Sequence, residues 1–188
     1  MGESKAFLDF DGEPLLSRVV GRVAALARDV VVVAQEDQPL PPCGGARIVR
    51  DGVPDSGPLV GLVAGLEAID PASPWAFVCT TDAPWIHGAV VMRLAERGEG
   101  FDAAVASVDD KPHVLTAVYR PYALAEARAL VSRGERRASL LSERLLTRYI
   151  TRVELLADEA VRLGDPELLT FENLNTPEDI LRARRRRS

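Results

Sequence analysis

Short runs of apolar residues recur along the chain and predict a series of strands. The clearest run is at residues 30–34, where four consecutive valines precede an alanine. An uninterrupted apolar run of this length, rich in β-branched residues, is typical of a strand buried on both faces, as the strands of a parallel sheet are. The other runs that predict strands are residues 46–50, 75–79, 101–106, 114–119 and 149–155.

Between these runs lie segments that predict helices, most of them with apolar residues at intervals of three and four positions. They are residues 15–27, 59–69, 88–97, 121–132 and 139–146, and Thr176–Pro177 marks a further helix start. Strands that alternate with helices indicate a parallel sheet flanked by helices. We therefore expect an α/β fold, Rossmann-like, with a mostly parallel sheet and helices on both faces, and a single domain over residues 1–188.

The strand predicted at residues 75–79 ends in a polar segment that carries candidate chemistry. Asp82 follows this strand closely, and Ala83–Pro84 stops any immediate helix. In open α/β sheets, ligands bind outside the carboxyl ends of the strands. A carboxylate there is a suitable oxygen ligand for Mg²⁺. From its position alone, Asp82 either binds Mg²⁺ or caps the turn into the next helix.

A glycine- and proline-rich segment, DGVPDSGPLVGL, begins at Asp51 and leads into the helix predicted at residues 59–69. Glycines allow positive φ angles and a close approach of the backbone to a ligand. The free N–H groups at the start of the helix would form an anion site at the sheet edge. An ordinary junction between a loop and a helix explains the same residues equally well.

Composition excludes several classes of protein. The chain has 188 residues, of which 47% are hydrophobic and 27% charged, and its net charge is −5. A net negative charge argues against a nucleic-acid partner, and we interpret the basic run Arg184–Arg187 as a solvated helix end. No apolar run approaches the ~20 residues of a membrane span. Without a signal peptide, and with Cys43 and Cys79 at no metal or redox spacing, we expect a cytoplasmic protein without disulfides.

Six segments together resemble the molybdenum cofactor guanylyltransferases, the MobA-like proteins. In chain order they are MGESKAFLDFDGEPLL, DGVPDSGPLVGL, VCTTDAPWI, KPHVLTAVYR, GERRASL and FENLNTPEDI. They occur in the family's order and span nearly the whole chain. The resemblance implies transfer of GMP from GTP to molybdopterin-bound molybdenum cofactor, with release of pyrophosphate and with Mg²⁺ as cofactor.

The resemblance also implies roles for individual residues. Lys5 would contact the nucleotide phosphates, Asp82 would hold Mg²⁺, and Asp51 would lie beside the guanine nucleotide. The residues implied on the pterin side are Asn173, Asn175, Arg136 and Arg137. Local sequence offers plainer explanations for some of them: Lys5 is also compatible with a surface lysine, and Asn173 and Asn175 with turn and cap chemistry before Thr176.

One departure from the family pattern has consequences for activity. The family opens with a buried strand and a glycine-rich LAGGxSxR loop, whereas Met1–Gly2 matches the Met-Gly that follows this loop. We expect the absent strand to be central and to leave two neighbouring strands without a partner. Our preferred hypothesis is a start codon misassigned to an internal Met. The alternatives are an inactive, truncated relative that binds a nucleotide, a pterin or a cofactor-maturation protein, and a nucleotidyltransferase with another acceptor.

Overall fold

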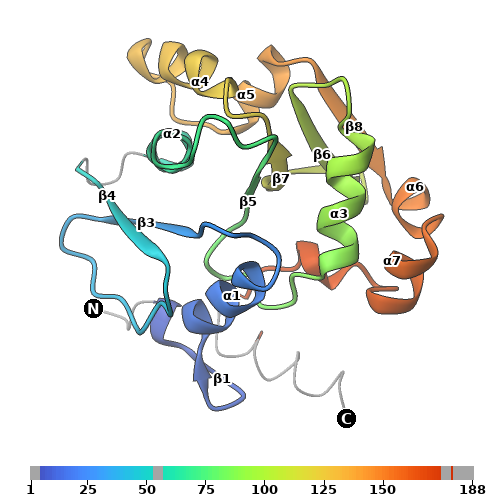
Figure 1. Cartoon of the computed structure of the whole chain (residues 1–188), viewed down its shortest axis with the longest axis horizontal. Coiled ribbons are helices and arrows are strands. Elements are labelled where there is room, and N and C mark those ends of the chain that lie inside the picture. The colour runs from blue at the N-terminus through green and yellow to red at the C-terminus, as the bar shows by residue number, and fades with distance from the viewer. Residues whose placement is uncertain (1–4, 53–56, 175–178, 180–188) are drawn as a thin grey trace.

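The computed structural model describes residues 5–52, 57–174 and 179. Its strands form a two-stranded sheet and a four-stranded sheet of order β5-β7-β6-β8, together with a small β1–β2 hairpin (Figure 1). The strand bounds are β1 Asp9–Phe10, β2 Glu13–Pro14, β3 Val31–Gln35, β4 Arg47–Asp51, β5 Ala76–Val78, β6 Ala103–Val108, β7 Lys111–Tyr119 and β8 Thr147–Thr151.

The pairing of these strands is mixed. β3 pairs with β4, and β6 with β8, in parallel. β7 is antiparallel to both of its neighbours, β5 and β6. The predicted α/β class is confirmed, and the antiparallel β7 follows from its connection: only Asp109–Asp110 separates it from β6, and a two-residue loop joins antiparallel strands only. Both aspartates have positive φ, 51° and 58°, as a type I′ turn requires.

Helices cover both faces of the four-stranded sheet, as predicted. Their bounds are α1 Leu15–Ala24, α2 Pro58–Ala68, α3 Gly88–Arg97, α4 Ala123–Ser132, α5 Ser139–Arg144, α6 Arg152–Leu156 and α7 Glu159–Gly164, with 3-10 turns η1 Lys5–Phe7 and η2 Leu169–Phe171. One hydrophobic cluster joins α2, α4 and α5 to the sheet, and a second joins α3, α6 and α7 to it (Figure 1). None of the helices in the described ranges is long and apolar enough to cross a membrane.

The alternation of side chains along β6 divides the core between these two clusters. Ala103 and Val105 belong to the cluster with α2 and α4, while Ala104 and Ala106 belong to the cluster with α3. All four side chains are fully buried. Successive residues of a strand point to opposite faces, and a strand with both faces covered has no polar position. Residues 103–106 are the uninterrupted apolar part of the run 101–106 from which the strand was predicted.

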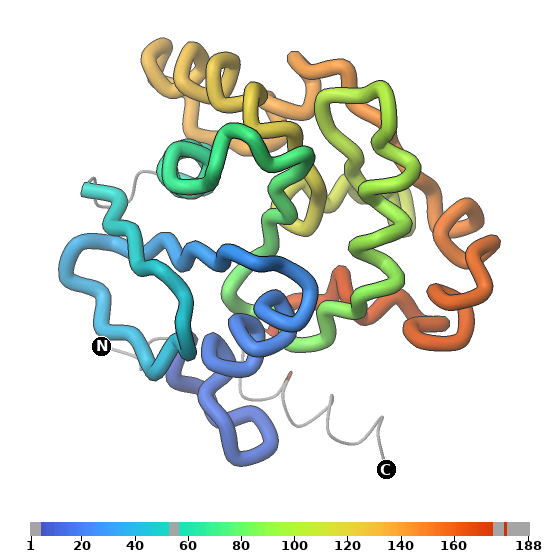
Figure 2. Tube along the Cα trace, in the orientation of Figure 1, coloured from blue at the N-terminus to red at the C-terminus, as the bar shows by residue number. Residues whose placement is uncertain are grey.

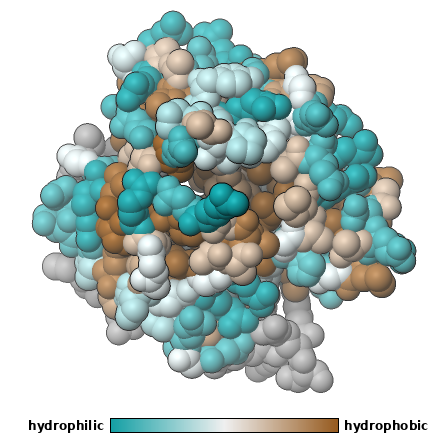
Figure 3. Space-filling model, viewed as in Figure 1, coloured by the Kyte–Doolittle hydropathy of each residue, from teal (hydrophilic) through white to brown (hydrophobic). Residues whose placement is uncertain are grey.

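The sheet is broken between β3 and β5. No pairing joins these strands in the part of the chain that the structure describes; β3 pairs only with β4 there, and β5 only with β7. The three residues of β5 are half-buried, so this strand is less buried than its continuous apolar run predicts. Hydrophobic surface gathers over this middle region of the molecule (Figure 3). The unpaired edges explain the exposure of β5, because no neighbouring strand covers its free side.

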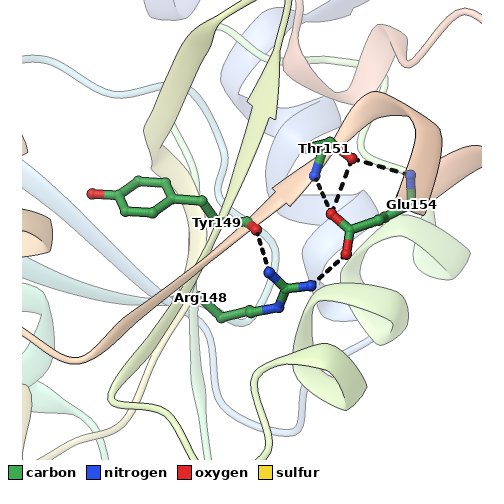
Figure 4. A network of polar contacts seen from close by, with 4 residues as sticks. All are labelled: Arg148, Tyr149, Thr151 and Glu154. Atoms are coloured by element: carbon green, nitrogen blue, oxygen red, sulfur yellow. Dashed lines mark hydrogen bonds and ion pairs between the residues drawn. The ribbon is translucent and has the colours of Figure 1, made fainter.

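The end of β8 is also earlier than predicted, because a helix begins at residue 152. The Thr151 hydroxyl accepts a hydrogen bond from the Glu154 N–H at 3.3 Å, and the Glu154 carboxylate accepts one from the Thr151 N–H at 3.0 Å. This reciprocal pair is a capping box. Arg148 also binds the Glu154 carboxylate (Figure 4). Thr151 therefore starts α6, and the strand prediction for residues 149–155 is wrong beyond Thr151.

Replacing Glu154 by alanine is expected to lower the free energy of unfolding by about 1 kcal/mol at pH 7. Hydrogen bonds from Thr151 and the charge of Arg148 lower the pKa of Glu154. A carboxyl group with a lowered pKa in the folded state stabilises the fold above its unfolded pKa, and this contribution is lost as the pH falls through the folded pKa. The difference between the two proteins should therefore shrink below about pH 4 in urea titrations.

Glu154→Gln is the matched control, since glutamine retains the capping hydrogen bonds without the charge. We expect it to lose less than half as much stability as Glu154→Ala at pH 7. Equal losses in both variants would show that the carboxylate charge, and not the capping geometry, stabilises this helix start.

Candidate active site

Asp82 lies in the loop that connects β5 to α3. The neighbouring Ala83 is fully buried, which anchors this loop in the core. The next helix is capped by His87, whose Nδ1 accepts a hydrogen bond from the Ala89 N–H at 3.3 Å. The alternative interpretation of Asp82 as the cap of α3 is therefore wrong. Asp82 remains at the carboxyl end of β5, as the sequence predicts.

The structure brings Asn173 to the same place. The Asp82 carbonyl accepts a hydrogen bond from the Leu174 N–H at 2.8 Å. The Thr80 hydroxyl donates one to Asn173 Oδ1 at 3.2 Å. The end of the described C-terminal segment thus runs beside the β5–α3 loop, as Figure 2 shows for the orange-red and green parts of the tube. Asn175, predicted to lie on the same side, is outside the described residues.

Two carboxylates, each at or after the carboxyl end of a strand, have an oxygen without a hydrogen-bond partner among the described residues. Asp82 Oδ1 and Asp51 Oδ1 are both buried and have no hydrogen-bond partner among the described residues. A buried acceptor without a partner is unfavourable by ~1–3 kcal/mol. Such an oxygen suits a cation or a donor supplied by a ligand. The donor chemistry at Asp82 therefore fits Mg²⁺.

Asp51 is the last residue of β4 and lies over the start of α2. Its Oδ2 is 4.0 Å from the position that a Cβ on Gly61 would occupy. Gly57, just before α2, has φ 79°, and a Cβ there would approach Arg136 Cβ to 2.9 Å. Glycine is therefore favoured at position 57 for two reasons: its positive φ angle, and the short distance to Arg136, which leaves no room for a Cβ atom.

Arg136 lies beside the start of α2. The Arg136 carbonyl accepts a hydrogen bond from the Leu59 N–H at 3.1 Å. One N–H group at the N-terminus of α2 is therefore already bonded within the protein. The Arg136 guanidinium donates to the Glu135 carbonyl at 2.9 Å. Arg137 is the exposed neighbour in the same loop. The pterin contacts predicted for both arginines stay predictions.

Lys5 is exposed at the start of η1. The following residue, Ala6, is buried in a cluster with Leu16 and Val20 of α1 and Val32 of β3. This packing fixes the backbone that carries Lys5 against α1 and β3. The position is compatible with a contact to phosphates, and the role of Lys5 stays a prediction.

A buried polar network that the sequence analysis missed connects the C-terminal segment to the Asp82 loop. Asp165 is only 5% exposed. Its carboxylate accepts hydrogen bonds from the Leu169 N–H at 2.7 Å, the Thr170 N–H at 3.0 Å and the Thr170 hydroxyl at 2.7 Å. The Thr170 oxygen accepts one from the His87 N–H at 3.1 Å. The only sequence signal is an aspartate at the end of a short helix.

Cys79 lies next to this site, and we expect its thiol to react slowly with alkylating reagents. Burial, and secondly the charge of Asp82, raise the pKa of Cys79 to about 12. Because the thiolate is the reactive form, alkylation at pH 8 should be at least ~100-fold slower than for an unperturbed thiol. The rate should rise without a plateau up to pH 10. A plateau below pH 10 in a pH series with iodoacetamide would contradict this.

Comparison with known proteins identifies the family. The family model described as "MobA-like NTP transferase domain" matches residues 1–152. The chain belongs to the MobA-like NTP transferases. A relative from Natronomonas pharaonis, named as a probable molybdenum cofactor guanylyltransferase, is 33% identical over 100% of this chain and 92% of its own length. One of the same name from Methanosarcina acetivorans is 33% identical over 94% and 80%.

Solved structures agree with this assignment. Molybdopterin-guanine dinucleotide biosynthesis protein A from Archaeoglobus fulgidus matches with a TM-score of 0.76 and 25% identity, covering 97% of this chain and 89% of that one. A cytidylyltransferase for 2-C-methyl-D-erythritol 4-phosphate from Thermus thermophilus, at 20% identity and a TM-score of 0.69 over 97% and 92%, shows the same fold. This member of the MobA-like family therefore has a nucleotidyltransferase fold and belongs to an enzyme family of that class.

Proposed function

We propose that this protein transfers GMP from Mg-GTP to molybdopterin-bound molybdenum cofactor and releases pyrophosphate. The observation that carries the proposal is the buried Oδ1 of Asp82, which has no hydrogen-bond partner in the described part of the chain and lies at the carboxyl end of β5, near Asn173. The relatives named as molybdenum cofactor guanylyltransferases support the choice of nucleotide and acceptor.

Asp82 would hold the Mg²⁺ ion. Within the described ranges, no group of three or more His, Cys, Asp or Glu side chains could hold a metal. Mg²⁺ commonly binds one or two carboxylates and completes its coordination with water and substrate phosphates, so a single aspartate fits. The ion would supply positive charge to the triphosphate. Lys5 would add a cation whose long side chain can follow the phosphates.

The reaction requires alignment and charge stabilisation more than a protein nucleophile. A phosphate oxygen of the acceptor forms a bond to the α-phosphorus of GTP, and the bond from that phosphorus to the bridging oxygen breaks, so that pyrophosphate leaves. In-line positioning of the two substrates lowers this barrier. Asp51 would position the nucleotide beside α2. Asn173, with Asn175, would orient the acceptor, and Arg137 could bind its anionic groups.

The break between β3 and β5 supports a further part of the proposal: the active domain carries an additional parallel strand between them. Both strands have an unpaired edge in the described structure, and backbone groups there would gain hydrogen bonds from an inserted strand. The same break favours the second candidate, a relative that binds nucleotide or pterin without turnover.

Nucleotide selectivity tests the proposal directly. A ligand that binds only the folded state stabilises it in proportion to ln(1 + [L]/Kd). With Mg²⁺ present, GTP should raise the melting temperature, and CTP at the same concentration should raise it less. An equal or larger shift with CTP would contradict guanylyl transfer and favour another nucleotidyltransferase.

A further inference from the structure

A cavity of about 330 Å³ lies between the β6–β7 turn and the segment that leads into η2. Its polar lining includes side chains from three regions: Asp109, Lys111 and His113 from the turn and β7, Arg152 from the start of α6, and Glu167 and Glu172 from the C-terminal segment. A volume of this order lies at the lower end of the range of small-molecule sites. None of these residues has a role in the proposed function.

The strand order places this cavity on the acceptor side of Asp82. Asp51 ends β4, Asp82 follows β5, and the cavity lies beyond them at the ends of β7 and β6. Glu172 lines the cavity, and the next residue, Asn173, binds Thr80 near Asp82. A molecule in the cavity could therefore reach toward Asp82 from the side opposite to Asp51.

The charges of the lining argue for a neutral ligand with both donors and acceptors. Three carboxylates and two permanent cations line the cavity, so it has no positive excess that would favour a phosphate. Burial, and secondly the charge of Lys111, lower the pKa of His113. A neutral imidazole donates from one ring nitrogen and accepts at the other. The lining can thus form hydrogen bonds with the donors and acceptors of a polar heterocycle on several of its edges.

The cavity also has an aromatic wall. The ring centroids of His113 and Phe171 are 4.9 Å apart, and the ring planes are inclined by 45°. Phe171 and Leu168 are buried in the cluster that contains α3. Leu168 has a left-handed backbone with φ 57°, held by its N–H bond to the Asp165 carbonyl at 3.0 Å. The core therefore fixes the apolar side of the cavity in advance of binding.

We propose that this cavity binds the planar 2-amino-4-oxo ring system of the acceptor. In this arrangement the carboxylates accept hydrogen bonds from the amino and ring N–H groups, Arg152 and Lys111 donate to the carbonyl oxygen, and the His113–Phe171 wall covers the ring. The inference rests on the proposed function. Guanine presents the same 2-amino-oxo edge, and the position of the cavity away from Asp51 assigns it to the acceptor and not to the nucleotide.

Biopterin is the probe, because its ring is fluorescent and carries the same edge. Fluorescence anisotropy titrations of the full chain should show saturable binding. His113→Phe retains the ring against Phe171 and removes both nitrogens, and Glu167→Gln removes one charged acceptor. Loss of a hydrogen bond to a charged group corresponds to roughly a tenfold change in affinity, so Glu167→Gln should raise the Kd for biopterin about tenfold. His113 is neutral and its hydrogen bonds are weaker, so His113→Phe should raise the Kd about fivefold.

Glu159→Gln, on the exposed face of α7 and outside the cavity lining, is the matched control and should leave the Kd unchanged within a factor of about two. Absence of saturable binding, or unchanged affinity in both cavity variants, would each overturn the proposal.

The outcome is separable from that of the proposed function. Should the protein bind biopterin as described and yet release no pyrophosphate from GTP, the catalytic proposal fails and the cavity assignment stands. Should it turn over GTP while the cavity variants keep full affinity for biopterin, the cavity assignment alone fails.

Discussion

Replacing Asp82 by asparagine is expected to lower the rate of pyrophosphate release by ~10³-fold, a barrier increase of about 4 kcal/mol. The substitution retains the shape of the side chain and removes the charge of a buried oxygen to which no described residue donates a hydrogen bond. Because the Leu174 N–H binds the Asp82 carbonyl and not its side chain, the loop should keep its conformation. Initial rates at saturating GTP and Mg²⁺, with circular dichroism as a check on folding, measure the effect.

Asp70→Asn is the matched control for this substitution. Asp70 lies in the connection before β5, at the opposite end of that strand, and its side chain accepts a hydrogen bond from the Ala72 N–H at 2.9 Å. Its rate should stay within about twofold of the original. A folded Asp82→Asn protein with more than a tenth of the original rate would refute the role of Asp82 in binding Mg²⁺ during turnover.

Replacing Asp165 by alanine is expected to lower the free energy of unfolding by about 3 kcal/mol. The change leaves three donors, from Leu169 and Thr170, without their acceptor in a region where Asp165 and Thr170 are 5% and 0% exposed. Thr170 also holds the His87 N–H, so the β5–α3 loop loses part of its anchoring. Urea unfolding gives the stability, and we expect weaker binding of the acceptor in the same protein.

Asp158→Ala provides the comparison within the same region of the chain. Asp158 caps α7 through one hydrogen bond, to the Val161 N–H at 3.1 Å, and loss of an N-cap costs about 1 kcal/mol. If Asp165→Ala is no more destabilising than Asp158→Ala, the Asp165 network is not the anchor that its geometry indicates.

Most helices and strands could be predicted because burial imposes a period on the sequence. Residues 103–106 of β6 are apolar throughout because both faces of the strand are covered. α1 presents Leu15, Leu16, Val19, Val20 and Val23 to the core at helical spacing. These patterns depend only on local chain geometry, so the elements can be predicted without knowing which other elements they pack against.

The features that escaped prediction depend on partners far away in the sequence or on turn chemistry. Asp109–Asp110 forms the tight β6–β7 turn without the usual Asn-Gly signal, so the reversal of β7 was not expected. β5 is half-buried because one of its edges has no partner strand in the described structure, and strand order cannot be predicted from the local sequence. The sequence predicted a strand as far as residue 155, but the cap formed by Thr151 starts α6 and ends β8 at residue 151.

The position of the candidate site was predictable in part for the same reason. Asp82 was singled out because it closely follows a strand, and Asn173 because a family segment carries it; the fold places their segments side by side, and their roles stay predictions. Arg136 belongs to a family segment as well, yet its main chain packs against the start of α2. A motif identifies residue types, whereas their neighbours depend on long-range packing.

The central claim is guanylyl transfer, and pyrophosphate release with GTP, Mg²⁺ and molybdenum cofactor tests it most directly. We predict that the folded protein releases pyrophosphate only when GTP and molybdenum cofactor are both present. A folded protein that binds GTP but releases no pyrophosphate would contradict the account and favour a protein that only binds its ligands.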